Sequence, residues 1–305
     1  MELDGRLRKT PRQARSRSTV EAILEAAERV LRSDGYRAAS TNRVARVAGF
    51  SVGSLYQYFD DKQAVVGALL DQVLRAEAER LAQRLDELVR VEAGEARERA
   101  VRAALAERSA KAHLLRILDA HAPELCPEPP LLHALRVQAP VVADPLHRLA
   151  AAHFTGAFRG GFDEGLAVVS RFVHALGYAL AVDAPEHVDG EAVAAHAVGA
   201  LAALARGGAT LAPAARELHD AWRAGSGAAF ADAAGRARRI RESRSVLLRG
   251  TVLPPAALEP TVLLVAAVGE VVAELRDSPP PSLDPTRAYA AAARLLQACL
   301  DAAAR

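Results

Sequence analysis

Residues 44–59 have the sequence VARVAGFSVGSLYQYF, which decides the fold of the N-terminal part of this 305-residue chain. Two short helices that cross in close contact need a small residue in the first helix. They also need a glycine at the turn and an apolar residue about six positions beyond it. Ala45, Gly49 and Leu55 meet these requirements. The stretch therefore predicts a helix-turn-helix.

Residues that cap helices set the limits of the first of these two helices. Ser40 or Thr41 can accept a hydrogen bond from a backbone N–H of the first turn, and Gly49 can end the helix after about two turns. The apolar residues of this helix share one face, which we expect to lie inside the fold: Val44, Ala45 and Ala48.

The second of the two helices begins after Ser51, which is also a capping residue. We expect this helix to span residues 52–59 and to bury Leu55 and Phe59, which lie one turn apart on the same face.

A longer amphipathic helix is expected in front of this pair. Ser18 and Glu21 have the spacing of a capping box, so the helix should begin at Ser18. Gly35 supplies a left-handed C-terminal residue, which places the helix end near Ser33. The apolar residues between these limits recur at helical intervals: Val20, Ile23, Leu24, Ala27, Val30 and Leu31.

The outer face of helix 52–59 carries short or hydrogen-bonding side chains, a composition that suits the major groove of DNA. Gln57 can bond an adenine edge, Val52 can touch a thymine methyl group, and Gly53 allows close approach. Ser54 lies on the same face, and we expect Tyr56 to bind a phosphate.

A fourth helix should follow, capped by Asp60 or Asp61. Lys62 then falls in its first turn, where the helix dipole disfavours a cation unless an anion lies nearby. A DNA phosphate would be such an anion.

Taken together, this segment resembles the DNA-binding pattern of the tetracycline-repressor (TetR) family. The residues that carry the resemblance are Ile23, Ala26, Ala27, Gly35, Thr41, Val44, Ala45, Ala48, Gly49, Phe50, Ser51, Gly53, Ser54, Leu55, Tyr56, Phe59 and Lys62. The resemblance implies that Thr41 and Asn42 touch the DNA backbone, that residues 52–58, including Tyr58, enter the major groove, and that Tyr56 and Lys62 hold phosphates. Gln57 departs from the pattern, in which an aromatic residue or histidine is more usual.

A structural role is the alternative for the aromatic cluster Tyr56, Tyr58 and Phe59. We accept it for Phe59 and favour the DNA role for Tyr56.

Basic residues gather at the front of the chain. Residues 1–62 hold 12 Lys and Arg against 8 Asp and Glu, whereas the remainder holds 27 against 29. Six of them follow one another with no acidic residue between: Arg6, Arg8, Lys9, Arg12, Arg15 and Arg17. We expect residues 1–17 to form a flexible basic arm and residues 18–62 the DNA-binding domain. A solvated tail without a role is the alternative.

Residues 63–205 are predicted to form a helical regulatory domain. The resemblance implies that this domain binds a small-molecule effector and that helices at about 166–182 and 190–205 form the dimer face. Five residues are candidates for the lining of an effector pocket, with core filling as the alternative: Ile117, Phe154, Phe158, Phe172 and Tyr178.

Residues 206–305 are predicted to add a further helical segment, because the resembling family commonly ends near residue 205. An apolar helix at 260–276, a proline break and an Ala-rich helix at 285–304 repeat the layout of 166–205 and indicate a partial duplication. The helix near 228–249 carries a cluster of arginines that predicts a solvated face or a second nucleic-acid patch: Arg236, Arg238, Arg239, Arg241 and Arg244.

Other classes of protein have little support in the sequence. Cys126 and Cys299 are far apart, so no disulfide framework is indicated, and His113, His121 and Cys126 lack the spacing of a metal site. No phosphate loop, nucleophile elbow or carboxylate constellation points to an enzyme or a cofactor. The apolar run 165–182 contains Arg171 and His174, so no membrane segment is expected. The two separate cysteines indicate a reducing, cytoplasmic location.

The sequence thus predicts an all-α chain that acts as a ligand-responsive homodimeric repressor on a palindromic DNA operator. The alternative is a DNA-tethered module whose C-terminal helices recruit a partner protein.

Overall fold

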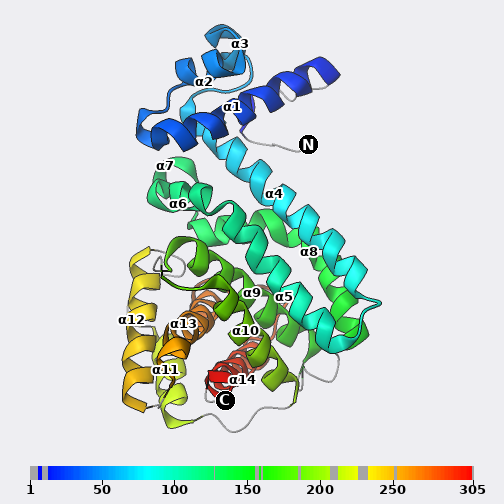
Figure 1. Cartoon of the computed structure of the whole chain (residues 1–305), viewed down its shortest axis with the longest axis vertical. Coiled ribbons are helices and arrows are strands. Elements are labelled where there is room, and N and C mark those ends of the chain that lie inside the picture. Colours follow the sequence, from blue (N-terminus) through cyan, green and yellow to red (C-terminus); the bar gives the residue numbers. More distant parts are fainter. Residues whose placement is uncertain are drawn as a thin grey trace. The chain divides into compact units, whose positions relative to one another are not determined.

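The structure is a computed structural model that describes residues 6–8, 13–126, 128–154, 158, 161–184, 187–206, 212–225, 233–250 and 253–303. Within these ranges every regular element is a helix, as predicted (Figure 1). The helices are α1 (Ala14–Ala38), α2 (Thr41–Ala48), α3 (Val52–Tyr56), α4 (Lys62–Leu88), α5 (Ala93–Ala110), α6 (Ala112–Ala120), α7 (Ala122–Leu125), α8 (Pro130–His153), α9 (Phe162–Val182), α10 (Gly190–Ala205), α11 (Pro213–Ala224), α12 (Ala233–Gly250), α13 (Pro255–Asp277) and α14 (Pro285–Ala303).

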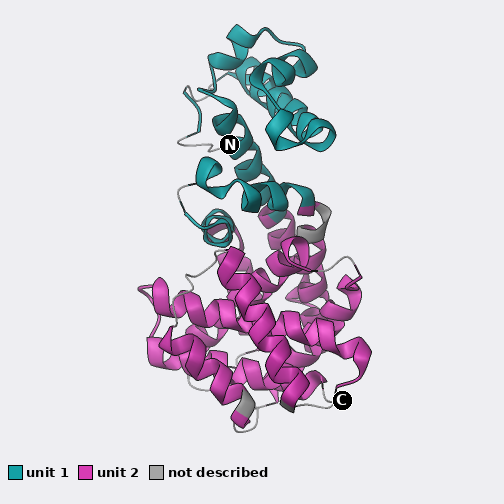
Figure 2. Cartoon of the chain, turned by 90° about the vertical axis from the view of Figure 1, so that its left-hand side faces the viewer, with its two compact units in different colours: residues 1–77, 113–138 teal, residues 78–112, 139–305 magenta. Residues whose placement is uncertain are grey.

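The chain forms two compact units, and each draws on separate parts of the sequence (Figure 2). Unit 1 contains residues 1–77 and 113–138, whereas unit 2 contains residues 78–112 and 139–305. This division differs from the expected boundaries at 62/63 and 205/206. The chain passes from one unit to the other within α4, at the start of α6 and within α8.

Helix α1 begins four residues before the predicted start, at Ala14. The predicted capping box at Ser18 is wrong, because the Ser18 hydroxyl bonds the carbonyl oxygen of Ala14, 3.2 Å away, inside the helix. Gly35 interrupts α1 with a φ of 72°, which agrees with its predicted left-handed conformation.

Helices α2 and α3 begin as the capping residues predict. The Ser40 hydroxyl accepts the backbone N–H of Arg43, and the Ser51 hydroxyl accepts that of Ser54. Gly49 follows α2 in the left-handed conformation, with a φ of 76°. Helix α3 ends at Tyr56, so it is shorter than the predicted 52–59.

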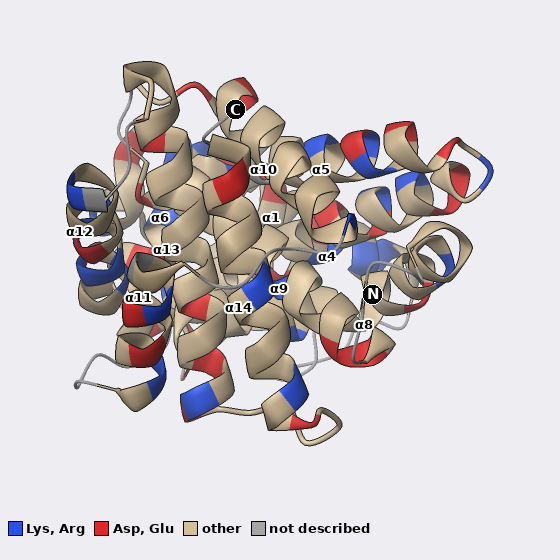
Figure 3. Cartoon of the chain, turned by 90° about the horizontal axis from the view of Figure 1, so that it is seen from below, with Lys and Arg blue, Asp and Glu red and all other residues tan. Residues whose placement is uncertain are grey.

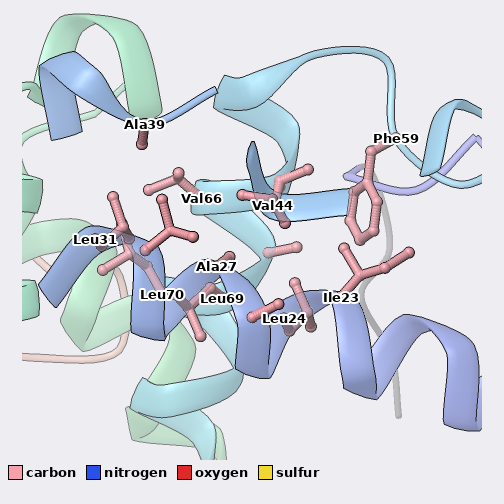
Figure 4. Close-up of a cluster of buried hydrophobic side chains, with 14 of the residues drawn as sticks. Ile23, Leu24, Ala27, Leu31, Ala39, Val44, Phe59, Val66, Leu69 and Leu70 are labelled. Carbon is pink, nitrogen blue, oxygen red and sulfur yellow. The ribbon is translucent and has the colours of Figure 1, made fainter. Parts of the chain in front are cut away.

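One apolar cluster holds α1 to α4 together in unit 1 (Figure 4). Leu55 and Phe59 are both fully buried, as predicted, and Figure 4 shows the Phe59 ring beside Ile23 of α1. Leu114, Leu118 and Leu125 of α6 and α7 belong to the same cluster. Residues from the predicted regulatory domain therefore form part of the core of unit 1, which also contains the predicted DNA-binding helices.

The basic arm differs from the prediction where the structure describes it. Arg15 and Arg17 belong to α1, while Arg6 hydrogen-bonds the carbonyl oxygen of Leu125 and lies 3.4 Å from Asp71. Arg8 hydrogen-bonds the carbonyl oxygens of Tyr56 and Tyr58. Lys9 and Arg12 lie outside the described residues.

Helix α13 forms the centre of unit 2. Every residue from Pro260 to Leu275 is buried, because α9, α10, α11, α12 and α14 all pack against this helix. The predicted extension is therefore the core of unit 2 and not an appendage. This burial also explains why α13 is apolar on every face.

Two helices are long and apolar enough to cross a membrane, Phe162–Val182 and Pro255–Asp277. In the structure, 50% of the apolar window of the first and 83% of that of the second are buried inside the protein. Buried core helices have the same length and composition, so neither helix by itself indicates a membrane segment.

Helices α9 and α10, which the resemblance assigned to a dimer face, contact other helices of their own chain. Both pack against α13 and α14, and α5 covers a further side of each. A dimer face on these two helices would therefore have to use the residues that α5, α13 and α14 leave exposed.

Buried ion pairs connect α13 and α12 to the helices around them. Glu270 bonds Arg239 at 2.6 Å, and Glu274 bonds Arg171 of α9 at 2.8 Å. Burial raises the pKa of Glu274, although Arg171 opposes the shift. Each carboxylate compensates a guanidinium that would otherwise be buried without a counter-charge.

Arg236 and Arg239 of α12 differ from both predictions made for them, whereas Arg241 is exposed, as a solvated face requires. Arg236 and Arg239 are only 3% and 2% exposed, and Arg236 bonds Asp183 at 2.9 Å. Arg238 pairs with Glu242, and Arg244 pairs with Glu259. Figure 3 shows several basic residues on α12, in which Glu242 is the one acidic residue. The carboxylates that pair with Arg236, Arg239 and Arg244 come from other segments of the chain.

We predict that Glu270→Gln lowers the free energy of unfolding by about 3 kcal/mol, because Arg239 keeps its buried charge without a carboxylate partner. The double variant Arg239→Met/Glu270→Leu should regain most of this loss, since neither charge remains. Urea unfolding followed by circular dichroism measures both. Arg99→Met, which removes an exposed i,i+4 pair with Glu95, is the control and should change stability by less than about 0.5 kcal/mol.

Candidate DNA interface

The outer face of α3 presents the predicted DNA-contacting residues to solvent. Gly53, Tyr56 and Gln57 are exposed, and so is Asn42 at the start of α2. The remaining predicted residues of this surface are half-buried: Thr41, Val52, Ser54 and Tyr58. Val52 and Tyr58 pack against the apolar cluster of unit 1, so the core fixes their positions.

Tyr56 links the end of α3 to the start of α2. Its hydroxyl lies 3.1 Å from the Thr41 hydroxyl, and 40% of the residue is exposed. The two hydroxyls therefore stand at one place on the surface, where each can donate to or accept from an external group. This arrangement brings together two residues that the sequence predicts to contact the DNA backbone.

Ser54 has a structural role in addition to its place on this face. Its backbone N–H and its hydroxyl both bond the hydroxyl of Ser51, at 3.0 Å and 2.8 Å. The side chain is thus part of the N-terminal cap of α3, so it fixes the start of the helix.

Gly53 is not required by the fold. Its φ lies outside the left-handed region, and a Cβ there would lie 3.7 Å from the Ser51 hydroxyl oxygen, an ordinary contact. No described atom of the protein therefore excludes a side chain at this position. A side chain would instead obstruct the close approach of an external molecule, such as DNA whose groove floor faces α3.

Lys62 has a partner that the sequence reasoning missed. Its ammonium group donates to the carbonyl oxygen of Tyr36 at 3.1 Å and lies 4.1 Å from the centre of the Tyr36 ring. The carbonyl oxygen and the ring face of Tyr36 in α1 thus supply the partial negative charge that stabilises a cation in the first turn of α4. To reach a phosphate, Lys62 must leave Tyr36 or bind both.

Tyr36 itself is held by α7. Its hydroxyl donates to the Glu124 carboxylate at 3.0 Å, and its ring packs against His121 with the ring centres 4.1 Å apart. Burial and the bond to Glu124 raise the pKa of Tyr36 to about 12. A chain of contacts therefore runs from α7 through Tyr36 to Lys62.

Arg8 is a further residue of this surface. In the sequence, only the basic composition of residues 1–17 points to a DNA role for it. Its backbone N–H donates to the Tyr58 carbonyl oxygen at 2.9 Å, and its guanidinium donates to the Tyr56 carbonyl oxygen at 3.2 Å. The same guanidinium pairs with Asp60 at 2.8 Å. The arm thus follows the C-terminal end of α3 and adds a cation there.

The five predicted pocket residues do not meet in one cavity. Ile117 packs against the core of unit 1, and Phe154 packs against a separate cluster around Leu85 and Leu149. Phe172 and Tyr178 are fully buried in the core of unit 2. Phe158 lines a small hollow in unit 2 together with Gly165, Val168 and Leu204. For the other four, the structure supports the alternative of core filling.

No group of three or more His, Cys, Asp or Glu side chains in the described ranges is arranged to hold a metal ion.

Comparison with known families supports the interpretation of this surface. Residues 23–69 match the family model described as "Bacterial regulatory proteins, tetR family". The match covers most of α1, all of α2 and α3, and the beginning of α4. No curated protein matches the chain.

We predict that Gly53→Ala leaves the protein as stable as before or slightly more stable, since alanine favours a helix over glycine by up to about 1 kcal/mol. The same change should weaken binding to specific DNA at least tenfold, because the added methyl group separates α3 from the groove. Fluorescence anisotropy measures DNA binding, and a thermal melt measures stability. Gly190→Ala, which makes an ordinary 3.5 Å contact in unit 2, is the matched control. Unchanged DNA affinity in Gly53→Ala would show that α3 does not approach DNA at this residue.

Proposed function

Because the chain is a DNA-binding transcriptional regulator of the TetR family, we propose that it is a ligand-responsive cytoplasmic repressor without catalytic activity. Two copies bind a palindromic operator, and each inserts α3 into a major groove. The observation that carries the proposal is the outer face of α3. There Gly53, Tyr56 and Gln57 are exposed on a short helix that the core holds in place through Leu55.

The contacts divide into two kinds. Gln57 and Val52 read base edges, while Tyr56, Thr41, Asn42 and Lys62 hold phosphates. Phosphate contacts fix the register of the helix in the groove, and base contacts provide the sequence preference. Because α3 is short, one copy reads only a few base pairs, and a second half-site adds the remaining specificity.

The two copies would associate through a surface other than the buried sides of α9 and α10. Those sides already contact α13 and α14 of the same chain. The proposal of two copies rests on the proposed palindromic operator. The mass of the complex between protein and DNA tests the number of copies.

An effector response is supported by the way in which the chain connects its two units. Residues 113–138 lie between two segments of unit 2 and yet belong to the core of unit 1. Glu124 in this segment holds Tyr36, which in turn holds Lys62. A ligand that shifts unit 2 would act on these residues through the three chain crossings, and by thermodynamic linkage it would change DNA affinity.

Recruitment of a partner protein by the C-terminal helices has less support. The most apolar of them, α13, is buried from Pro260 to Leu275 and offers no surface for docking.

We predict that the purified protein binds its own upstream intergenic DNA much more tightly than random DNA at moderate salt. Tyr56→Phe/Lys62→Ala should lose at least tenfold in affinity, because it removes one phosphate-binding hydroxyl and one cation. The slope of log affinity against log salt should fall by about one. Arg99→Ala, an exposed arginine of α5, is the control and should bind like the unchanged protein.

Equal and weak binding of the specific and the random DNA would refute the proposed operator recognition. Sedimentation of the complex measures how many copies bind. A complex with one copy would refute the homodimer while leaving the DNA contacts in place.

A further inference from the structure

Residues 6–8 are bound to unit 1 at each of their three positions, and we call them the N-terminal strap. The Arg6 side chain contacts α4 and α7, and Leu7 packs against the apolar cluster of unit 1. Arg8 contacts the chain at the end of α3 and just beyond it. The strap therefore connects α4 and α7 with the C-terminal end of the helix that is proposed to read DNA.

Arg6 is the anchor of the strap. Its guanidinium donates to the carbonyl oxygen of Leu125, the last residue of α7, and pairs with the Asp71 carboxylate of α4 at 3.4 Å. The last carbonyls of a helix have no partner inside that helix, so Arg6 satisfies one of them. With a side chain that is only 19% exposed, Arg6 is held on several sides.

Gly67 of α4 makes room for this anchor. It is a buried residue inside a helix, where glycine is less favourable than alanine. A Cβ at Gly67 would overlap the guanidinium of Arg6, so the arginine occupies space that any other residue would fill. Asp71 follows one turn later on the same side of α4. Two residues of α4, one turn apart, therefore fit a bound Arg6.

Asp71 also connects the anchor to α8. One oxygen of its carboxylate faces Arg6, and the other lies 2.7 Å from the Nε2 atom of His133, which is 1% exposed. Leu125 and His133 both belong to residues 113–138, the segment that lies between two parts of unit 2 in the sequence. This segment thus holds Arg6 directly through Leu125 and indirectly through Asp71.

Arg8 is the clamp at the other end of the strap. Its backbone N–H donates to the Tyr58 carbonyl oxygen at 2.9 Å, and its guanidinium donates to the Tyr56 carbonyl oxygen at 3.2 Å. These two carbonyls lie on either side of Gln57 in the chain. Because α3 has only five residues, donors from outside the helix are needed to fix the chain at its end. Arg8 therefore holds the backbone around Gln57, while the Gln57 side chain stays exposed.

The shape of the Arg8 side chain matters as well as its charge. The same guanidinium pairs with the Asp60 carboxylate at 2.8 Å, so its planar fork spans Asp60 and the Tyr56 carbonyl at once. A lysine would bring the same charge as a single point on a flexible stem. The fork thus ties together the chain before and after Gln57, which a lysine would do less well.

We propose that Arg8 is a positioning residue for Gln57, and that the N-terminal strap thereby sets the base preference of α3. The proposal rests on the proposed function, because it requires α3 to read DNA. It goes further in assigning part of the sequence specificity to a residue that acts through the backbone of α3. Since Arg6 anchors the strap, the base preference also depends on α4 and α7.

Selection from a library of random DNA duplexes tests the proposal, with sequencing of the bound duplexes to measure the preference at each base position. The proteins compared are the unchanged chain, Arg8→Lys, Gln57→Ala and the double variant Arg8→Lys/Gln57→Ala. Arg29→Lys is the matched control, because Arg29 is an exposed arginine of α1 in the same unit. Fluorescence anisotropy with one random duplex measures binding that is independent of sequence, and thermal melts check that each variant is folded.

We expect Arg8→Lys to lower the preference at least about fivefold at the base position that Gln57→Ala also affects. Its affinity for the random duplex should stay within about twofold of the unchanged value, because the charge is kept. The double variant should lose no more preference than Gln57→Ala, since Arg8 acts through Gln57. Arg6→Met should weaken the preference at the same position, because it releases the anchor, whereas Arg29→Lys should change nothing.

The proposal is overturned if Arg8→Lys keeps the base preference of the unchanged protein, or if it affects a different position from Gln57→Ala. Equal weakening of all duplexes also overturns it, because Arg8 would then contact only phosphate. An unchanged protein that enriches no sequence would contradict the proposed function together with this inference. A clear preference that survives in Arg8→Lys contradicts this inference alone.

Discussion

A helix that is apolar on every face must be covered on every face, and α13 imposes this constraint on unit 2. Five helices pack around it, and they include α9 and α10 from the part of the chain that precedes the extension. The two acidic residues in its buried stretch, Glu270 and Glu274, require cations, which α12 and α9 supply as Arg239 and Arg171. The extension therefore cannot be a peripheral addition. It provides the core helix, and the surfaces of α9 and α10 are used to cover that helix.

In unit 1 the constraint is the opposite one: α3 must leave much of its surface uncovered if it is to contact DNA. Helix α3 is short and has one buried residue, Leu55, so most of its surface is available to a ligand. Such a helix depends on its neighbours for stability, because one turn of helix is marginal by itself. The Ser51 cap and the apolar cluster supply that support. Residues 113–138 add to the cluster, and unit 1 therefore depends on a segment that lies far from α1 to α4 in the sequence.

The sequence predicts best the features that depend on neighbouring residues. The caps of α2 and α3, the left-handed Gly35 and Gly49, and the burial of Leu55 and Phe59 follow from local spacing, and all of them are observed. Ser18 shows the limit of such reasoning, since the same serine can cap a helix or bond back inside one.

Features that depend on distant partners were not predictable. Arg236 and Arg239 look like a solvated basic face until Asp183 and Glu270 are placed beside them. The aromatic residues proposed for a pocket also have no local signal that separates core from cavity.

Lys62 shows how a distant contact changes the meaning of a local signal. A cation in the first turn of a helix indicates a nearby anion, and the sequence alone suggests a phosphate. In the structure the Tyr36 carbonyl and ring fill this role, and Tyr36 is fixed by Glu124 of α7. The two interpretations are compatible, because an ammonium group has three donors and Tyr36 uses one of them through its carbonyl. The position of Lys62 then depends on α7 as well as on DNA. The residue that would bind a phosphate is consequently coupled to the segment through which the chain leaves and re-enters unit 2.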